Sequence, residues 1–366
     1  MQLSILLYCR AGFEKECAAE IIEYAALLNI QGYVNAKENS AHVLFHFIDQ
    51  TQVVSFWKNL HLEKLIFSRQ ILLTSPMCSS LPEKNRTNPI LAYLEQYFLD
   101  LIKDNKYLED LFVETFDTDE YKEILSFCKK FTSPMVSALK NKGYILRDIN
   151  NSLYRLHLVF LDSRSCFIGL SLIGRSSKWY MGIPRLKFPE NAPSRSTLKL
   201  EEAFLTFMSE ADRATRLQPG MKAIDLGASP GGWTYQFVKR SIYVYAIDNG
   251  AMDKSLLNSG LVEHLQVDGF KFIPKKPVHW LVCDMVEKPF RIAQLIAERA
   301  SCKIASEFIF NLKLPMKKKY DEVKKCIMYI EENLNSANIK FNIKCKQLYH
   351  DRDEVTVWLY IYGATS

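Results

Sequence analysis

The segment Asp225-Leu-Gly-Ala-Ser-Pro-Gly-Gly-Trp233 is the most informative part of the chain for the fold class of its second half. It follows the apolar run KAIDL and leads into GWTYQFVKR, a pattern that predicts a strand, a glycine-rich turn and a helix. Glycines let the backbone approach a ligand closely, and the helix N-terminus offers free N–H groups. No Gly-Lys-Ser/Thr follows, which excludes a Walker loop, and the glycine spacing differs from the dinucleotide pattern G-x-G-x-x-G.

Four acidic residues accompany this turn. Asp225 precedes it, and the expected strands that follow end at Asp248, Asp268 and Asp284. The carboxyl ends of parallel strands share one edge of a sheet, where an acid can hydrogen-bond a ribose diol. Any one of these acids alone is more often a helix cap or a loop residue. Together, after a glycine-rich turn, they favour an adenosine-type cofactor.

The sequence patterns on both sides of the turn are typical of an α/β domain. Strand patterns alternate with helical patterns from TLKLEEAFLTFM onward, which predicts a mostly parallel sheet covered on both faces. Two further strand patterns, KFNIKCKQL and EVTVWLYIY, are joined by the short segment YHDRD and predict an antiparallel hairpin at the end of the sheet. We therefore expect a Rossmann-like domain over residues 196–366.

The first part of the chain has a different pattern. Residues 1–173 mix short strands and helices, which predicts an α+β domain. Residues 174–195 show neither a strand nor a helix pattern and are rich in proline and basic residues. We expect them to form a linker. Its basic side chains alternate with Trp179, Tyr180 and Phe188, a mixture that suits phosphates and stacked bases. RNA contact is favoured over the alternative, a proline-rich connector packed along both domains.

Composition narrows the class of protein. The 366 residues include 48% hydrophobic and 24% charged residues, as in ordinary globular proteins. Residues 1–170 carry 18 Lys and Arg against 20 Asp and Glu, whereas residues 171–366 carry 29 against 21. The second half thus has a net charge of +8 and could attract a polyanion, although a merely basic surface would look the same.

Other sequence features concern location and metals. No apolar run approaches the ~18 residues of a membrane span. The N-terminus reads as a first strand rather than a secretory signal, and the scattered cysteines without a CxxC pair suit a reduced, cytoplasmic protein with no metal site. We expect no membrane association and a monomer.

Several motifs of this chain resemble those of a known family. DLGASPGGW with a downstream Asp resembles the cofactor loop of FtsJ-like, ribose 2′-O-specific methyltransferases that use S-adenosyl-L-methionine. PSRSTLKLEEAF, VCDMVEKP, NLKLPMKKKY and LYHDRDEVTV are similar to the bacterial members that modify a cytidine of 23S rRNA. The likeness covers essentially the whole chain. It implies a seven-stranded sheet and, over residues 1–173, a ferredoxin-like and THUMP domain that binds RNA.

The resemblance also implies a catalytic tetrad: Lys199 in TLKLEE, Asp284 in VCDMV, Lys313 in NLKLP and Glu354 in DEVTV. A ribose 2′-hydroxyl is a poor nucleophile, so its proton must be accepted as the methyl group transfers. An ordinary lysine, with a pKa of about 10.4, is protonated at neutral pH, and a second cation or desolvation lowers that pKa. The hypothesis is therefore that Lys313 is the general base, tuned by Lys199 and oriented by the two carboxylates.

For the cofactor, the resemblance implies contacts from Ser196, Ser229, Pro230, Gly231, Gly232, Asp248 and Asp268, with Asp284 near the methionine end. The RNA partner implied is 23S rRNA or a precursor of the large subunit. The basic run Lys317-Lys318-Lys319 is another candidate for RNA contact, and a solvated helix start explains it equally well.

Other classes of protein fit these residues less well or equally leave the substrate undefined. Amino-group methylation usually shows Asn/Asp-Pro-Pro-aromatic after the fourth strand, where this chain has Asp284-Met285-Val286-Glu287. Methylation of pyrimidine C5 needs a cysteine nucleophile, and Cys283 fits a core strand position better. A dehydrogenase is disfavoured by the glycine spacing. A ribosome-assembly factor with an inactive methyltransferase fold, or a methyltransferase for another RNA, remains open.

Overall fold

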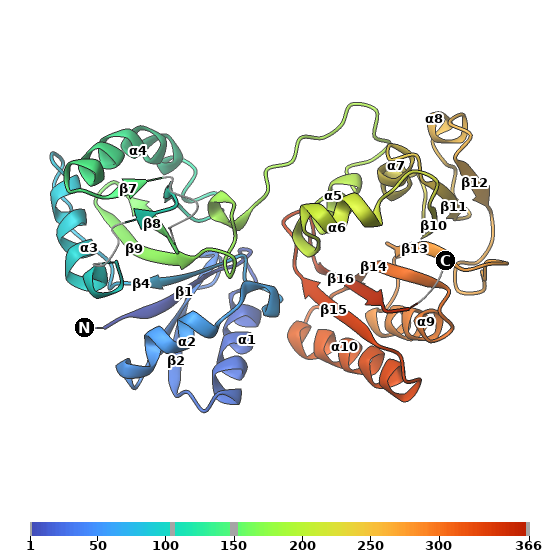
Figure 1. Ribbon diagram of the computed structural model, residues 1–366, viewed down its shortest axis with the longest axis horizontal. Coiled ribbons are helices and arrows are strands. Elements are labelled where there is room, and N and C mark those ends of the chain that lie inside the picture. Colours follow the sequence, from blue (N-terminus) through green and yellow to red (C-terminus); the bar gives the residue numbers. More distant parts are fainter. Residues whose placement is uncertain (1, 103–106, 147–152, 364–366) are drawn as a thin grey trace. The chain divides into compact units, whose positions relative to one another are not determined.

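The computed structural model describes residues 2–102, 107–146 and 153–363. The chain divides into two compact units, one extending to Pro184 and the other beginning at Arg185 (Figure 1). This division falls inside the 174–195 segment that the sequence predicts as the linker. Among the described residues, no helix is both long and apolar enough to cross a membrane.

The first unit is built on a seven-stranded sheet with the order β2-β3-β1-β4-β9-β8-β6. Its strand pairs are antiparallel except for the parallel pair β6–β8. The strands are β1 (Ser4–Tyr8), β2 (Gly32–Ala36), β3 (His42–Phe47), β4 (Gln70–Thr74), β6 (Leu111–Glu114), β8 (Tyr154–Asp162) and β9 (Ser165–Leu172). The short strands β5 (Tyr107–Leu108) and β7 (Ile145–Leu146) form a separate parallel pair.

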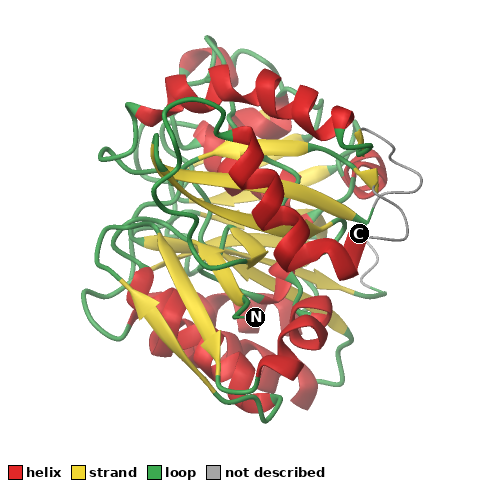
Figure 2. Cartoon of the chain, turned by 90° about the vertical axis from the view of Figure 1, so that its left-hand side faces the viewer, coloured by secondary structure: helices red, strands yellow, loops and turns green. Residues whose placement is uncertain are grey.

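Helices cover this sheet in two groups (Figures 1 and 2). Helices α1 (Glu14–Leu27) and α2 (Val53–Asn59) pack on β1, β2 and β3, whereas α3 (Thr87–Ile102) and α4 (Ile124–Asn141) pack on β6, β8 and β9. Short 3-10 helices occur at η1 (Gln50–Gln52), η2 (Leu62–Lys64) and η3 (Tyr180–Gly182). The α+β class expected for this half is confirmed.

The start of the expected linker is docked on the first unit. Ser177 shares two hydrogen bonds of 3.0 Å with the buried Gln70 side chain, and the N–H of Met181 donates to the buried Glu114 carboxylate at 2.5 Å. A Cβ on Gly182 would lie 2.3 Å from the carbonyl oxygen of Arg69. The backbone at Gly182 thus lies too close to Arg69 to admit a side chain, and with these hydrogen bonds this part of the segment packs as an extension of the first unit.

The second unit is built on a seven-stranded sheet with the order β12-β11-β10-β13-β14-β16-β15. Its strands are β10 (Lys222–Leu226), β11 (Tyr243–Ile247), β12 (Val262–Leu265), β13 (Val278–Cys283), β14 (Ala305–Lys313), β15 (Phe341–Lys346) and β16 (Glu354–Ile361). The first five are parallel, and β16 runs antiparallel to both β14 and β15. The predicted Rossmann-like sheet with its closing hairpin is confirmed.

Helices lie on both faces of this sheet, with α5 and α7 on one side and α9 and α10 on the other (Figure 1). Phe204 of α5 and Phe237 of α7 meet Trp280 of β13 in the core, with ring centroids 5.6 and 5.9 Å from the Trp280 ring. This packing fixes the start of α5 beside the glycine-rich turn. The helices are α5 (Thr197–Phe207), α6 (Glu210–Arg216), α7 (Gly232–Val238), α8 (Lys254–Leu257), α9 (Pro289–Ser301) and α10 (Lys319–Ser336).

Candidate active site

The glycine-rich turn connects β10 to α7 and is shaped by close backbone approaches. Gly231 has φ +120°, a conformation that L side chains rarely adopt. A Cβ on Gly232 would lie 2.1 Å from the Ser196 hydroxyl oxygen and 2.3 Å from that of Ser194. The indole N–H of Trp233 donates to the Ser196 carbonyl at 3.1 Å. The turn therefore holds Ser196, directly before α5, against the start of α7.

Asp248 closes the turn from the neighbouring strand. It follows the last residue of β11, and its carboxylate accepts the N–H of Ser229 at 3.0 Å and that of Gly250 at 2.7 Å. The Ser229 hydroxyl donates to the carbonyl of Ala251 at 2.8 Å. Each carboxylate oxygen of Asp248 can accept a second hydrogen bond, so the residue can receive the hydroxyls of a ribose.

Asp225 and Asp268 occupy contrasting environments. Asp225 is buried; its Oδ2 accepts the Thr234 hydroxyl at 2.7 Å, while its Oδ1 is buried with no hydrogen-bond partner. Burial raises the pKa of Asp225 to about 7, against the lowering effect of the Thr234 hydrogen bond. Asp268 is exposed and lies beyond β12, which ends earlier than the sequence pattern predicts; its carboxylate accepts the N–H of Phe270 at 2.9 Å.

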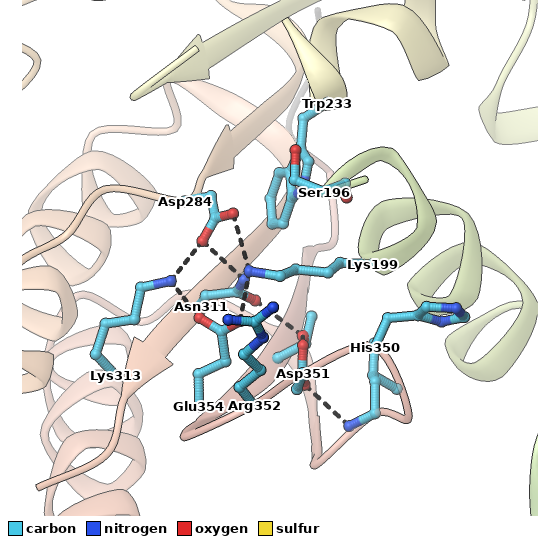
Figure 3. Close-up of polar contacts among 12 residues, drawn as sticks. Ser196, Lys199, Trp233, Asp284, Asn311, Lys313, His350, Asp351, Arg352 and Glu354 are labelled. Atoms are coloured by element: carbon cyan, nitrogen blue, oxygen red, sulfur yellow. Dashed lines mark hydrogen bonds and ion pairs between the residues drawn. The ribbon is translucent and has the colours of Figure 1, made fainter. Parts of the chain in front are cut away.

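The four residues of the expected tetrad lie together at the carboxyl edge of the sheet (Figure 3). The Lys199 ammonium is 3.2 Å from Asp284 Oδ2 and is ion-paired with Glu354. The Lys313 ammonium is 2.7 Å from Asp284 Oδ1 and is also ion-paired with Glu354. Two lysines thus share two carboxylates, which leaves the group with no net charge.

The elements that carry the tetrad explain why it assembles beside the turn. Asp284 directly follows β13, and its N–H donates to the carbonyl of Leu226 at the end of β10. Lys199 lies one helical turn beyond Ser196, in the first turn of α5. Glu354 begins β16, which runs antiparallel, so it reaches the same edge where β14 ends at Lys313.

The pKa of Lys313 differs from the sequence-based expectation that Lys199 lowers it. Burial disfavours the charged ammonium, but the negative charges of Asp284 and Glu354 outweigh burial and raise the pKa of Lys313 above its ordinary value. Lys199 faces the same two carboxylates, so each cation is compensated. With these ion pairs in place, Lys313 is protonated at neutral pH.

The structure adds supporting residues that sequence reasoning missed. Asn311 is fully buried and donates to Asp284 Oδ1 at 2.9 Å, and Thr356 lies 2.8 Å from the Asn311 carbonyl oxygen. Glu202, one turn after Lys199, accepts the N–H groups of Tyr349 and His350 at 2.7 and 2.9 Å. The position of Asn311 could have been predicted from its spacing, because it lies two residues before Lys313 and hence on the same face of the strand.

A cysteine nucleophile does not fit this site. Cys283 is buried in β13, and burial raises the pKa of its thiol to about 12. The thiolate that methylation of pyrimidine C5 would need is therefore strongly disfavoured.

Comparison with known families assigns the class of protein. The model described as FtsJ-like methyltransferase matches residues 192–335, which contain the glycine-rich turn, Asp248 and three of the tetrad residues. A Rossmann-like sheet with this turn and this match defines an enzyme, a methyltransferase that uses S-adenosylmethionine. Residues 1–72 match the RlmM ferredoxin-like domain, and residues 85–172 match the N-terminal model of ribosomal RNA large subunit methyltransferase M.

Similarity to individual proteins extends over almost the whole chain. The chain is 47% identical over 362 residues to ribosomal RNA large subunit methyltransferase M of Actinobacillus pleuropneumoniae serotype 5b (strain L20), covering 98% of each chain. It is 48% identical over 358 residues to the protein of the same name from Pasteurella multocida (strain Pm70), covering 96% of this chain and 97% of the relative. The chain belongs to the RlmM family.

Proposed function

We propose that this chain transfers a methyl group from S-adenosylmethionine to the ribose 2′-hydroxyl of a cytidine in 23S rRNA. The observation that carries the proposal is the shared pairing of Lys199 and Lys313 with Asp284 and Glu354, next to the glycine-rich turn. This arrangement offers amines and carboxylates to a hydroxyl. The large-subunit rRNA as substrate follows from the name that the relatives carry.

The residues around the turn fit the cofactor. Asp248 retains acceptor capacity for a ribose diol, and Asp268 is exposed beyond the end of the neighbouring strand. The unpartnered Oδ1 of Asp225 offers a buried acceptor for a donor of the ligand, such as an ammonium group. When bound, S-adenosylmethionine supplies an electrophilic methyl group on a positively charged sulfur, and that charge also disfavours a protonated lysine nearby.

Lys313 is the proposed general base. Neutral Lys313 Nζ would accept the proton of the 2′-hydroxyl while the hydroxyl oxygen bonds to the methyl carbon and the carbon–sulfur bond of the cofactor breaks to leave a neutral thioether. Asp284 and Glu354 would stabilise the resulting ammonium. Its exposed side-chain fraction, 26%, is higher than the 16% of Lys199. Lys313 is therefore the lysine more open to an incoming nucleotide, and Lys199 is the one that positions the carboxylates and the hydroxyl.

Basic surfaces are the proposed RNA contacts. Lys317 and Lys318 are exposed beyond the end of β14, four and five residues after Lys313. Arg185 donates to the Tyr349 hydroxyl at 3.0 Å, and its guanidinium lies over the Tyr349 ring. Tyr349 belongs to the loop whose backbone N–H groups donate to Glu202. Such cation and aromatic groups suit phosphates and stacked bases. The first unit, expected to be an RNA-binding THUMP-type domain, is the proposed second contact.

The deciding experiment measures transfer of labelled methyl from S-adenosylmethionine to unmodified 23S rRNA, with tRNA in parallel, followed by nucleoside mass spectrometry. The expected product is 2′-O-methylcytidine from 23S rRNA only. A base-methylated nucleoside would overturn the role of the tetrad. Methylation of tRNA instead would overturn the substrate, and cofactor binding without product on naked rRNA or on a large-subunit precursor would favour a non-catalytic assembly role.

A further inference from the structure

The orientation of Asn311 is fixed by its neighbours. Asp284 is held as a carboxylate by two lysine ammonium groups, so its oxygens only accept hydrogen bonds. The side-chain amide of Asn311 must therefore turn its NH2 group toward Asp284 Oδ1, 2.9 Å away, and its carbonyl oxygen toward Thr356.

The single hydroxyl hydrogen of Thr356 determines which hydrogen bonds this residue donates and which it accepts. The Thr356 hydroxyl lies 2.8 Å from the Asn311 carbonyl oxygen, which can only accept, so Thr356 donates its one hydrogen there. The same hydroxyl lies 3.1 and 3.0 Å from the two oxygens of Asp351. Toward Asp351 it can therefore only accept, and the carboxyl group of Asp351 must supply an O–H.

The environment of Asp351 suits a protonated acid. Asp351 and Thr356 are both fully buried. One oxygen, Oδ2, accepts the N–H of Leu348 at 2.9 Å, and the other, Oδ1, lies 3.1 Å from the Thr356 hydroxyl, where it can carry the proton. Burial, together with the charge of Glu354, raises the pKa of Asp351 well above its usual range.

We propose that Asp351, Thr356 and Asn311 form a directional chain of hydrogen bonds that positions Asp284 and, through it, Lys313. Asp351, Asn311, Asp284 and Lys313 are labelled in Figure 3. Each member donates to the next, from the protonated Asp351 to the ionised Asp284. The three are positioning residues, since each acts on the tetrad through its neighbour. This inference rests on the proposed function, because it takes Asp284 and Lys313 as members of the catalytic group.

The β-sheet explains why the chain is rigid. Asn311 and Thr356 are direct cross-strand partners on β14 and β16, next to the pair Lys313 and Glu354 on the same face. Opposed side chains on an antiparallel pair have Cβ atoms about 5 Å apart, so the hydrogen bond between Asn311 and Thr356 needs no long flexible side chain. Asp284 is therefore held by short side chains on its buried side and by the lysines on its open side.

The test compares Thr356→Val with Thr356→Ser in the full chain. Valine keeps the shape and removes the hydroxyl, so the Asn311 carbonyl and Asp351 lose their shared partner. The expected result is a fall in kcat of about tenfold or more, since small misplacements of catalytic groups cost that much, with little change in KM for S-adenosylmethionine or RNA. Thr356→Ser keeps the hydroxyl and is expected to restore most of kcat.

A second pair of variants tests the protonated end without depending on Thr356. In Asp351→Asn the side-chain amide can donate to Thr356 and accept from Leu348, so kcat is expected to stay near wild type; Asp351→Ala is expected to behave like Thr356→Val. A folded Asp351→Asn variant as impaired as Asp351→Ala would overturn the direction of the chain. Wild-type kcat in Thr356→Val would overturn the chain, whereas substantial activity in Lys313→Ala would overturn the proposed function itself.

Discussion

Lys313 and Glu354 stand directly opposite each other on the antiparallel strands β14 and β16, at the edge where the parallel strands end. Because β16 runs against its neighbours, its first residue meets the last residue of β14. The ammonium and the carboxylate therefore form an ion pair supported by the backbone ladder, and a second carboxylate, Asp284, is added from β13.

Arginine substitutions separate the base from the positioning cation. Lys313→Arg keeps a positive charge but cannot lose its proton, so we expect methyl transfer to fall by about 10² to 10⁴-fold. Lys199→Arg is expected to retain far more activity, because Lys199 acts through its charge. Single-turnover rates at saturating cofactor measure both, and equal losses would contradict the assignment of the base to Lys313.

Glu354→Gln tests the link between charge and protonation. Glu354 is one of the two carboxylates that raise the pKa of Lys313, so its neutralisation lowers that pKa. Neutral lysine then forms at lower pH, and the rising limb of log kcat against pH is expected to shift down by about one unit or more. Asp353→Asn is the matched control, since Asp353 is 76% exposed and pairs with Lys319. An unshifted limb in Glu354→Gln would argue against Lys313 as the titrating base.

Cofactor affinity depends on Asp248. In Asp248→Asn an amide NH2 would face one of the N–H groups of Ser229 and Gly250, which disrupts the turn and removes acceptors for the ribose. Because losing charge-assisted hydrogen bonds of this kind weakens binding, we expect the Kd for S-adenosylmethionine to rise about ten- to a hundredfold. Calorimetry checks this. Asp253→Asn removes a similar carboxylate, the cap of α8, and is expected to leave Kd nearly unchanged.

The stability of the second unit is expected to depend on the ionisation of Asp225. Its folded-state pKa, about 7, lies above the ordinary 3.8, so the unfolded chain releases this proton at lower pH than the folded one. Stability is therefore lost as pH rises from about 4 to 7, by up to about 4 kcal/mol from this group. Denaturant unfolding of Asp225→Asn at several pH values is expected to lack this component, and identical pH profiles for variant and wild type would contradict it.

Much of the second unit could be predicted from sequence because its strands and turns have strong local patterns. The apolar strands that contain Asp225 and Lys313, the strand that precedes Asp284, and the closing hairpin are found where the sequence patterns predict them. The family resemblance supplied the tetrad residues, and the structure brings their side chains together. Proximity could not come from local pattern, since Lys199 and Glu354 lie far apart in sequence.

Other features depend on tertiary contacts. The sequence patterns did not predict β2, α2 and α6, because these short segments lack a clear hydrophobic period. The patterns also predicted that β12 ends at Asp268, whereas the strand ends at Leu265. The raised pKa of Lys313 depends on the two carboxylates that its ammonium contacts, and the chain from Asp351 to Asn311 depends on hydrogen-bond geometry. Neither is encoded in a motif.

The alternation of side chains along β14 and β16 also makes this site a check on correct folding. A shift of one residue between the two strands would send Asn311 and Lys313 to the opposite face and leave Glu354 without its partner. The misaligned state would bury an uncompensated charge, a cost that apolar packing in the slipped register would have to overcome. The polar residues that serve chemistry thus also discriminate against a competing arrangement of the sheet.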